Sequence, residues 1–84
     1  MPIGKFIWDN EKLRANIKKN NVDFVEAATV FDDPHAELEY DTEHSIDEDR
    51  FILTGYSNKS RELIVCHCYR EDGDTIRIIS ARKT

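Results

Sequence analysis

Hydrophobic positions near the start of the chain predict a short strand followed by a helix. The apolar run Phe6–Trp8 is rich in residues that favour strands, and it ends at Asp9-Asn10, either of which can cap a helix. Leu13 and Ile17 are four residues apart, as they are on one face of a helix. The pair Asn20-Asn21 tolerates the left-handed conformation that often ends a helix. We therefore expect a strand and then a helix over residues 11–20.

A second helix is predicted by the positions that follow. Asp23 and Glu26 are three residues apart, which is the spacing of a capping box at a helix start. The next apolar residues recur at the i, i+3, i+4, i+7 spacing of one helix face: Phe24, Ala27, Ala28 and Phe31. Pro34 ends this helix, because the residue before a proline avoids helical backbone angles.

The remaining pattern predicts four strands separated by polar turns. From residue 35 apolar and acidic positions alternate, which indicates a half-buried strand with Leu38 and Tyr40 on one face and the neighbouring glutamates on the other. An acidic loop follows over residues 41–49. Short turns join three further runs, which predict adjacent antiparallel strands over residues 50–57, 62–69 and 75–82. The order β-α-α-β-β-β-β predicts an α+β fold, with two N-terminal helices packed on a mostly antiparallel sheet.

Length and composition indicate one soluble domain. The 84 residues are too few for two separate cores, so we expect a single domain over residues 1–84. Leu, Ile, Val and Phe make up a quarter of the chain, more than disordered chains contain. No stretch approaches the ~20 apolar residues of a membrane span, and the first residues lack the apolar core of a signal peptide. We therefore expect a cytoplasmic protein in which Cys66 and Cys68 are free thiols.

Charge is unevenly distributed along the chain. The formal net charge of -5, taken as one total, argues against a general binder of nucleic acid or membranes. Residues 1–49 carry a net charge of -8, however, and residues 50–84 carry +3. Arginines on or beside the last three strands supply most of the positive charge: Arg50, Arg61, Arg70, Arg77 and Arg82. Arginine forks on a rigid sheet suit phosphate or carboxylate binding, although they can instead pair with the acidic segment or simply face solvent.

The sequence predicts neither a cofactor nor a metal ion. The three glycines are scattered, so there is no phosphate-binding loop and we expect no nucleotide cofactor. His67 lies on the strand face opposite Cys66 and Cys68, so these residues do not form one metal site. His67 is either an acid or base or a packed core residue, and we expect His44, in the acidic loop, to be solvated.

Several motifs resemble the BrnT family of bacterial type II toxins, and together they span residues 6–82. The first half contributes Phe6-x-Trp8-Asp9, Lys12, Asn16, Lys19, Asp23-Phe24-x-Glu26-Ala27 and Val30-Phe31-x-Asp33-Pro34. The second half contributes Glu48-x-Arg50-Phe51, Gly55-Tyr56-Ser57, Arg61-x-Leu63-x-Val65, Tyr69-Arg70 and the distinctive Ile76-Arg77-Ile78-Ile79-Ser80-Ala81-Arg82.

The resemblance implies a compact RelE-like α+β fold and a toxin with metal-independent endoribonuclease activity on messenger RNA. It also implies a cognate BrnA-like antitoxin of the ribbon-helix-helix DNA-binding type, so that contact with DNA occurs only through the antitoxin and no membrane is involved. Two features depart from the family pattern. Lys19-Asn20-Asn21 replaces the common Lys-His-Gly, so a role for that histidine does not transfer. The chain stops at Thr84, where family members usually continue, so we expect the C-terminal helix to be absent or truncated.

Metal-free RNA cleavage needs a base for the 2′-hydroxyl proton, positive groups around the phosphorus and an acid for the 5′ oxygen. As catalytic residues we select the stabilisers Arg82, Ser80, Arg77 and Arg70 and the proton-transfer lysines Lys19 and Lys12. As RNA-binding residues we select Arg50, Arg61, Trp8 and His67. Aromatic rings such as that of Trp8 stack on bases, although aromatic residues on strands more often belong to the core. Ser80 and Arg82 share one face of a regular strand, whereas Arg77 needs a bulge or a twist to join them.

Two other interpretations of the same residues stay open. The arginine-bearing sheet can instead bind an acidic antitoxin segment, in which case the chain is a non-catalytic interaction module that acts as a corepressor. Alternatively, the segregated charge is purely structural, and the acidic loop pairs with the basic sheet within the monomer.

Overall fold

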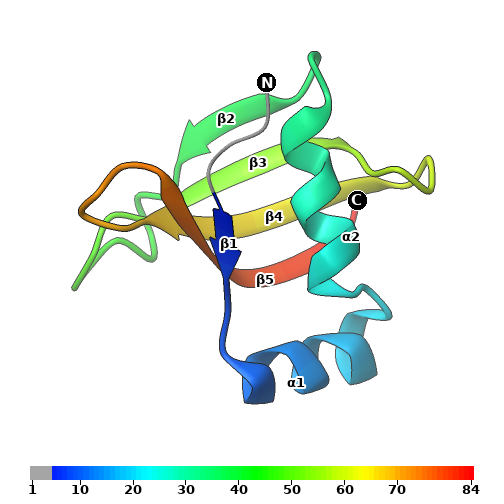
Figure 1. Cartoon of the computed structure of the whole chain (residues 1–84), viewed down its shortest axis with the longest axis horizontal. Coiled ribbons are helices and arrows are strands. Elements are labelled where there is room, and N and C mark those ends of the chain that lie inside the picture. The colour runs from blue at the N-terminus through cyan, green and yellow to red at the C-terminus, as the bar shows by residue number, and fades with distance from the viewer. Residues whose placement is uncertain (1–4) are drawn as a thin grey trace.

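The computed structural model describes residues 5–84, and its helices and strands follow the predicted order (Figure 1). They are β1 (Lys5–Ile7), α1 (Asn10–Asn20), α2 (Phe24–Thr29), the 3-10 helix η1 (Val30–Asp32), β2 (Glu37–Tyr40), β3 (Phe51–Tyr56), β4 (Glu62–Tyr69) and β5 (Thr75–Lys83). Residues 1–4, where we expect no signal peptide, lie outside the described part. Within residues 5–84 no helix follows β5, and none is long and apolar enough to cross a membrane.

Polar side chains set the ends of both helices. The Asp9 carboxylate accepts hydrogen bonds from two backbone N–H groups in the first turn of α1. This helix ends at Asn20, and the next residue, Asn21, has a φ of 59°, so the left-handed end predicted for Asn20-Asn21 lies at the second of the two. Asp23 caps α2 in the same way as Asp9 caps α1. The second half of the predicted capping box is wrong, because Glu26 does not reach back to Asp23 but pairs with Arg61.

A single five-stranded sheet forms the body of the protein, with the strand order β1-β5-β4-β3-β2. Strands β2 to β5 pair antiparallel, which confirms the mostly antiparallel sheet, whereas β1 pairs parallel with β5. The helix α2 crosses in front of one face of the sheet, and α1 lies beside β5 (Figure 1). No helix within residues 5–84 covers the other face, which we call the open face.

The hydrophobic core lies between α2 and the sheet. Its buried apolar residues are Val22, Phe24, Ala27, Val30, Leu53, Leu63, Val65, Ile76, Ile78 and Ala81. On β3 and β4 these residues alternate with residues that point to the other side, because successive side chains of a strand face opposite ways. The open face is therefore built from their sequence neighbours.

The strand β2 is less buried than its alternating pattern predicts. It pairs only with β3, at the edge of the sheet, and Leu38 and Tyr40 stay 52% and 48% exposed. The predicted half-burial is wrong here, because the two helices pack mainly against β5 and leave this edge largely uncovered.

Candidate active site on the open face of the sheet

A β-bulge in β5 brings Arg77, Ser80 and Arg82 to the same face of the sheet. The pairing of β4 with β5 shifts by one residue after Cys66, which leaves Ile79 without a direct partner. Residues that pair across two strands share a face, and the partners of the three site residues are alternate residues of β4. The bulge that Arg77 needs in order to join Ser80 and Arg82 is therefore present.

A cavity of about 210 Å³ opens on this face. The residues that line it are Asp41, His44, Arg50, Ile52, Ile64, Cys66, Ile79, Ser80 and Arg82. Arg50 directly precedes β3, in which Ile52, two residues later, pairs with Cys66 on the open face. Three of the predicted site residues, Arg50, Ser80 and Arg82, therefore surround one cavity. We call it the arginine cavity.

Glu48, in the acidic loop, links two arginines of the open face. Its carboxylate forms an ion pair with Arg77 and lies 3.9 Å from Nε of Arg50. The charge pattern allowed ion pairs between the acidic segment and the basic sheet, and Glu48 forms such a pair. The Nε donors of Arg50 and Arg77 are nevertheless buried and have no hydrogen-bond acceptor within residues 5–84. Because buried donors seldom lack an acceptor, this arrangement favours the binding of a further anion.

Between its charged side chains, the arginine cavity is lined by isoleucines, Cys66 and Ser80. Cys66 and Ser80 face each other across β4 and β5. Burial raises the pKa of the Cys66 thiol, so the sulfur is a neutral thiol rather than a nucleophile at neutral pH. The two cysteines are free, as predicted, and His67 points to the opposite side of the sheet from both of them.

Asp41 and His44 line the arginine cavity but were not selected from the sequence. Nδ1 of His44 lies 2.9 Å from one carboxylate oxygen of Asp41 and 3.2 Å from the other. The Asp41 side chain is 9% exposed, whereas that of His44 is 63% exposed. His44 is thus solvated as predicted, but it is also held by a carboxylate. The sequence carries no signal for this pair beyond a three-residue spacing.

The Ser45 hydroxyl fixes the base of the acidic loop. It donates a hydrogen bond to the carbonyl oxygen of Asp41 (2.5 Å) and accepts one from the N–H of Arg50 (2.9 Å). The Asp41 N–H also donates to the Arg50 carbonyl at 2.9 Å, which continues the pairing of β2 with β3. These bonds hold both ends of the loop against the cavity.

The predicted proton-transfer residues Lys12 and Lys19 lie on α1 and are exposed. They flank Asn16 along one side of the helix, since residues three and four apart share a side. Asn16 contacts the main chain of Ala81, the residue between Ser80 and Arg82. The two lysines therefore lie beside the edge of β5, and neither forms an ion pair within the described residues.

Arg70 is exposed in the turn after β4, outside the arginine cavity. It lines a separate hollow of about 570 Å³ together with Tyr69, Glu71, Asp72 and Glu48. Glu48 thus connects this hollow to Arg77 and Arg50. Arg70 therefore lies apart from Arg50, Ser80 and Arg82, which line the arginine cavity.

Trp8 and His67 belong to the packing of the helix side of the sheet. The Trp8 ring packs edge-on against Phe24, with their centroids 5.9 Å apart. His67 has no exposed surface, and its Nδ1 lies 3.1 Å from the carbonyl oxygen of Val65. Burial lowers the pKa of His67, so the ring is neutral. Because His67 cannot touch RNA from this position, and Trp8 packs with the core, we leave both out of the site.

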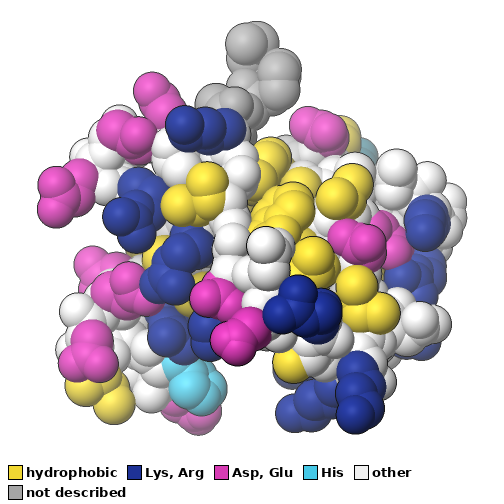
Figure 2. All heavy atoms as spheres, turned by 60° about the horizontal axis from the view of Figure 1, so that its bottom comes forward, with side chains coloured by type: hydrophobic (Ala, Val, Ile, Leu, Met, Phe, Trp, Pro, Cys, Tyr) yellow, Lys and Arg dark blue, Asp and Glu magenta, His cyan; other side chains and the backbone are white. Residues whose placement is uncertain are grey.

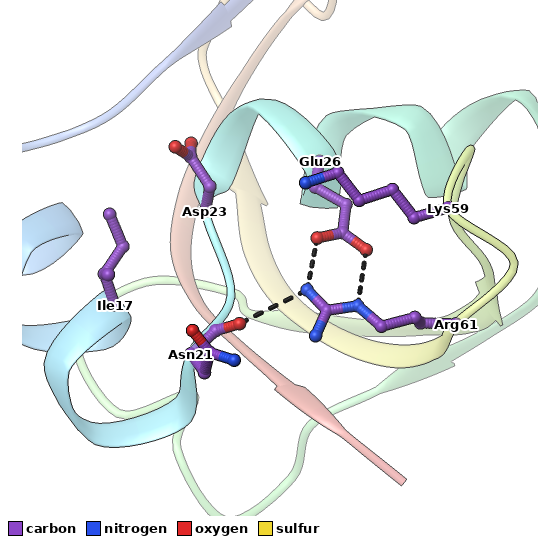
Figure 3. Close-up of a pocket in the computed structure, with 6 residues that line it drawn as sticks. All are labelled: Ile17, Asn21, Asp23, Glu26, Lys59 and Arg61. Carbon is purple, nitrogen blue, oxygen red and sulfur yellow. Dashed lines mark hydrogen bonds and ion pairs between the residues drawn. The ribbon is translucent and has the colours of Figure 1, made fainter.

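Arg61 lies outside the arginine cavity, in a hollow of about 390 Å³ (Figure 3). Its guanidinium faces the Glu26 carboxylate and forms two hydrogen bonds with it, and it donates a third to the Asn21 carbonyl at 3.2 Å. Arg61 lowers the pKa of Glu26, against the opposing effect of burial, and Ser57 donates a further hydrogen bond to the same carboxylate at 2.6 Å. Through Nε and Nη2, Arg61 holds α2 on the β3–β4 turn, and we leave it out of the site.

The surface charge is mixed. On the side that Figure 2 shows, Lys and Arg side chains lie in several groups among Asp and Glu side chains, and apolar side chains separate the groups. There is no continuous basic surface on this side that would coat a nucleic acid. This distribution favours a small local anion site over binding along an extended backbone.

Comparison with known proteins gives a family and a similar structure. Residues 8–84 match the family described as "Ribonuclease toxin, BrnT, of type II toxin-antitoxin system". Among solved structures, the chain is similar to the Brucella abortus ribonuclease toxin BrnT, with 23% sequence identity and a TM-score of 0.73 over 95% of each chain. At this identity the likeness is one of fold, and it confirms the α+β class. The sequence matches no curated protein.

Proposed function

Because this chain belongs to the BrnT family of ribonuclease toxins from type II toxin-antitoxin systems, we propose that it cleaves RNA without a metal ion, at the arginine cavity. Family membership implies an RNA substrate and an antitoxin partner. We choose this site because Arg50, Ser80 and Arg82 line one cavity and Arg77 lies on the same face of the sheet. The Nε donor of Arg50, which lines this cavity, has no hydrogen-bond acceptor within residues 5–84, and this supports an anion as the occupant.

The proposed reaction is an internal transfer at one phosphate. The 2′-oxygen of a ribose forms a bond to phosphorus, the bond to the 5′-oxygen of the next nucleotide breaks, and the products are a 2′,3′-cyclic phosphate and a 5′-hydroxyl end. Negative charge builds up on the non-bridging oxygens in the transition state. Arg50 and Arg82 stabilise this charge as fixed cations, and Ser80 donates a hydrogen bond to the same oxygens.

The remaining predicted residues take outer positions in this proposal. Arg77 holds the phosphate from the Glu48 side of the open face, and Arg70 binds RNA beyond the cavity. Lys12 and Lys19 approach along the edge of β5 and supply ammonium groups near the leaving oxygen. A lysine that gives up its proton near neutral pH needs neighbouring cations or a desolvated position.

We further propose a cytoplasmic, single-domain, RelE-like toxin whose RNA cleavage arrests translation. Its antitoxin is of the ribbon-helix-helix type, and the complex contacts DNA only through that antitoxin, with no role for a membrane. These expectations come from the sequence resemblance. The family membership supports the general scheme, in which an antitoxin neutralises the toxin.

A cleavage assay with purified protein tests the proposal. A labelled single-stranded RNA of defined sequence is incubated with the protein, in the presence of EDTA and in its absence. We expect equal cleavage in both, with 2′,3′-cyclic phosphate ends. Intact RNA at stoichiometric amounts of folded protein would refute the proposed function, and cleavage that EDTA abolishes would refute the metal-free reaction.

Substitutions then locate the reaction. We expect Arg82→Ala and Ser80→Ala to slow cleavage by about 100-fold or more, as the removal of one transition-state donor does, without unfolding the protein. Arg14→Ala is the matched control, because Arg14 is exposed on α1 and forms no ion pair within residues 5–84. Near-normal rates in the first two variants would place the reaction elsewhere on the molecule.

A non-catalytic function is the second candidate, and Glu48 favours it. The Glu48 carboxylate already pairs with Arg77 and lies 3.9 Å from Nε of Arg50, so carboxylates of an acidic antitoxin segment can bind the same arginines. This function predicts that the antitoxin displaces Glu48 while the protein alone leaves RNA intact. The EDTA assay therefore distinguishes the two candidates.

A further inference from the structure

We propose that His44 is the general base of the RNA cleavage reaction and that Asp41 holds it in position. This proposal rests on the arginine cavity being the cleavage site. It adds the one chemical function that arginines and a serine do not supply, which is a group that accepts a proton near neutral pH. His44 and Asp41 lie in the acidic loop, outside the strands that carry the arginines, and nothing in the sequence pattern selects them.

The hydrogen bond to Asp41 determines which nitrogen of His44 carries the proton. An ionised carboxylate has acceptors only, so Nδ1 of the neutral ring must be the donor. Nδ1 lies 2.9 Å and 3.2 Å from the two Asp41 oxygens. In this tautomer Nε2 carries a lone pair and is free to accept a proton. An imidazole oriented by a buried carboxylate through Nδ1 is the arrangement that serves as a base in other hydrolytic sites.

His44 and Asp41 lie where a general base and the carboxylate that orients it are needed. His44 lines the arginine cavity together with Arg50, Ser80 and Arg82, and its side chain is 63% exposed, which leaves it accessible to RNA. Asp41 is buried, and the bonds of Ser45 and Arg50 at the base of the loop fix its backbone. A phosphate between Arg50 and Arg82 therefore has an oriented imidazole beside it.

In the proposed step one bond to phosphorus forms as another breaks, and His44 accepts one proton. Nε2 of His44 takes the proton from the 2′-hydroxyl as the 2′-oxygen bonds to phosphorus. The bond from phosphorus to the 5′-oxygen breaks, and that oxygen takes up a proton from the ammonium group of Lys12 or Lys19, which regains a proton from solvent. His44 then releases its proton to solvent, and the neutral ring is restored. No oxidant, reductant or metal takes part in this sequence.

The contact between Asp41 and His44 can also be explained as one that only holds the acidic loop together. A pair whose histidine is mostly exposed contributes little to stability, so this explanation predicts a His44 variant with nearly normal cleavage. The charged and titratable groups that face His44 also have to be considered in any pH experiment. Across the cavity these are Arg50, Cys66 and Arg82, and on its own loop they are Asp41, Glu43, Asp47 and Glu48.

The test measures single-turnover cleavage of a labelled single-stranded RNA, and binding of the same RNA with 2′-O-methyl groups, by the His44→Ala variant. We expect cleavage to slow by at least about 100-fold, as the loss of a general base does, while the Kd for the methylated RNA changes less than threefold. Added imidazole should restore part of the rate, and the rate should lose its dependence on pH between 5.5 and 7.5. His35→Ala is the control, because His35 is an exposed histidine outside the cavity.

Other results overturn the proposal. A rate within threefold of the unchanged protein rules out His44 as the base. A slow variant that imidazole does not rescue, and that keeps the original pH dependence, assigns His44 a structural role instead. If His44→Ala does not fold, His44→Gln gives the same comparison with a side chain of similar size. In each of these cases the unchanged protein still cleaves RNA, so failure of this proposal is distinct from failure of the proposed function.

Discussion

Asn16, on α1, forms with Ala81 the two hydrogen bonds that a neighbouring strand would form. Its Nδ2 donates to the Ala81 carbonyl at 2.8 Å, and its Oδ1 accepts from the Ala81 N–H at 3.0 Å. The same Nδ2 donates to the carbonyl oxygen of Val22 at 2.9 Å. A helix side chain thus completes the edge of β5 where β1 no longer pairs with it, next to Ser80 and Arg82.

Removal of the Asn16 amide should therefore destabilise the protein strongly. We expect Asn16→Leu to lower the free energy of unfolding by about 3 kcal/mol, because it leaves the Ala81 N–H and carbonyl without their partner. Asn20→Ala is the control, since Asn20 is only part-buried and donates longer bonds, of 3.2 Å to the same carbonyl and 3.1 Å to Oδ1 of Asn16. Urea denaturation gives both values. Equal stability of the two variants would contradict this account of the β5 edge.

Neutralisation of Glu48 should strengthen RNA binding. Its carboxylate occupies Arg77 and Arg50, which an RNA phosphate needs. We expect Glu48→Gln to lower the Kd for a 2′-O-methyl RNA by about two- to fivefold, in keeping with the small contribution of a partly exposed ion pair. Glu71→Gln, at an exposed turn, removes the same charge and should have a smaller effect. An unchanged or higher Kd for Glu48→Gln would show that the RNA does not use these arginines.

We expect Arg61 to contribute to the stability of the fold and not to RNA cleavage. The Arg61→Ala change leaves the Glu26 carboxylate, which is 4% exposed, without its main partner. We expect a loss of about 2–3 kcal/mol in the free energy of unfolding, with the cleavage rate per folded molecule unchanged. Lys59→Ala, in the same hollow, should cost less than about 0.5 kcal/mol, as surface changes usually do. If Arg61→Ala loses cleavage and keeps its stability, the sequence-based choice of Arg61 as an RNA-binding residue is right.

Mild acid should destabilise the fold through His67. Burial lowers the pKa of this histidine in the folded protein, so the unfolded chain binds the proton at a higher pH than the folded one. The contribution to stability is therefore complete above about pH 7 and is lost as the pH falls from about 6.5 towards the folded pKa. Urea denaturation at several pH values measures this slope. The His67→Gln variant should lack it, and an unchanged slope in that variant would assign it to other groups.

Most of the fold could be predicted from local patterns. The capping residue Asp9, the left-handed Asn21 and the turns between the last strands gave the order and approximate bounds of the elements. The parallel pairing of β1 with β5 could not be predicted, because it joins segments about 70 residues apart through contacts that leave no periodic signal. The exposure of β2 depends on where α2 ends over the sheet, which is likewise a tertiary property.

The candidate site could be predicted only in part. Ser80 and Arg82 share a face by simple alternation, but Arg77 joins them through a bulge whose position the sequence does not mark. Arg61 seemed equivalent to the other arginines, because a sequence does not show which acid a long side chain will reach. For His44 the sequence predicts only a solvated loop position, because its contact with Asp41 and its place at the cavity depend on how the acidic loop folds back.

The site at which RNA binds can be observed on the folded protein in solution. In an NMR titration with a 2′-O-methyl RNA, the Nε–H signals of arginines report which guanidinium groups meet a phosphate. We predict saturable shifts for Arg50, Arg77 and Arg82, with Arg61 and Arg14 unchanged. Shifts confined to Arg61 or Arg14, or none at saturating RNA, would contradict the claim that the arginine cavity on the open face of the sheet holds the scissile phosphate.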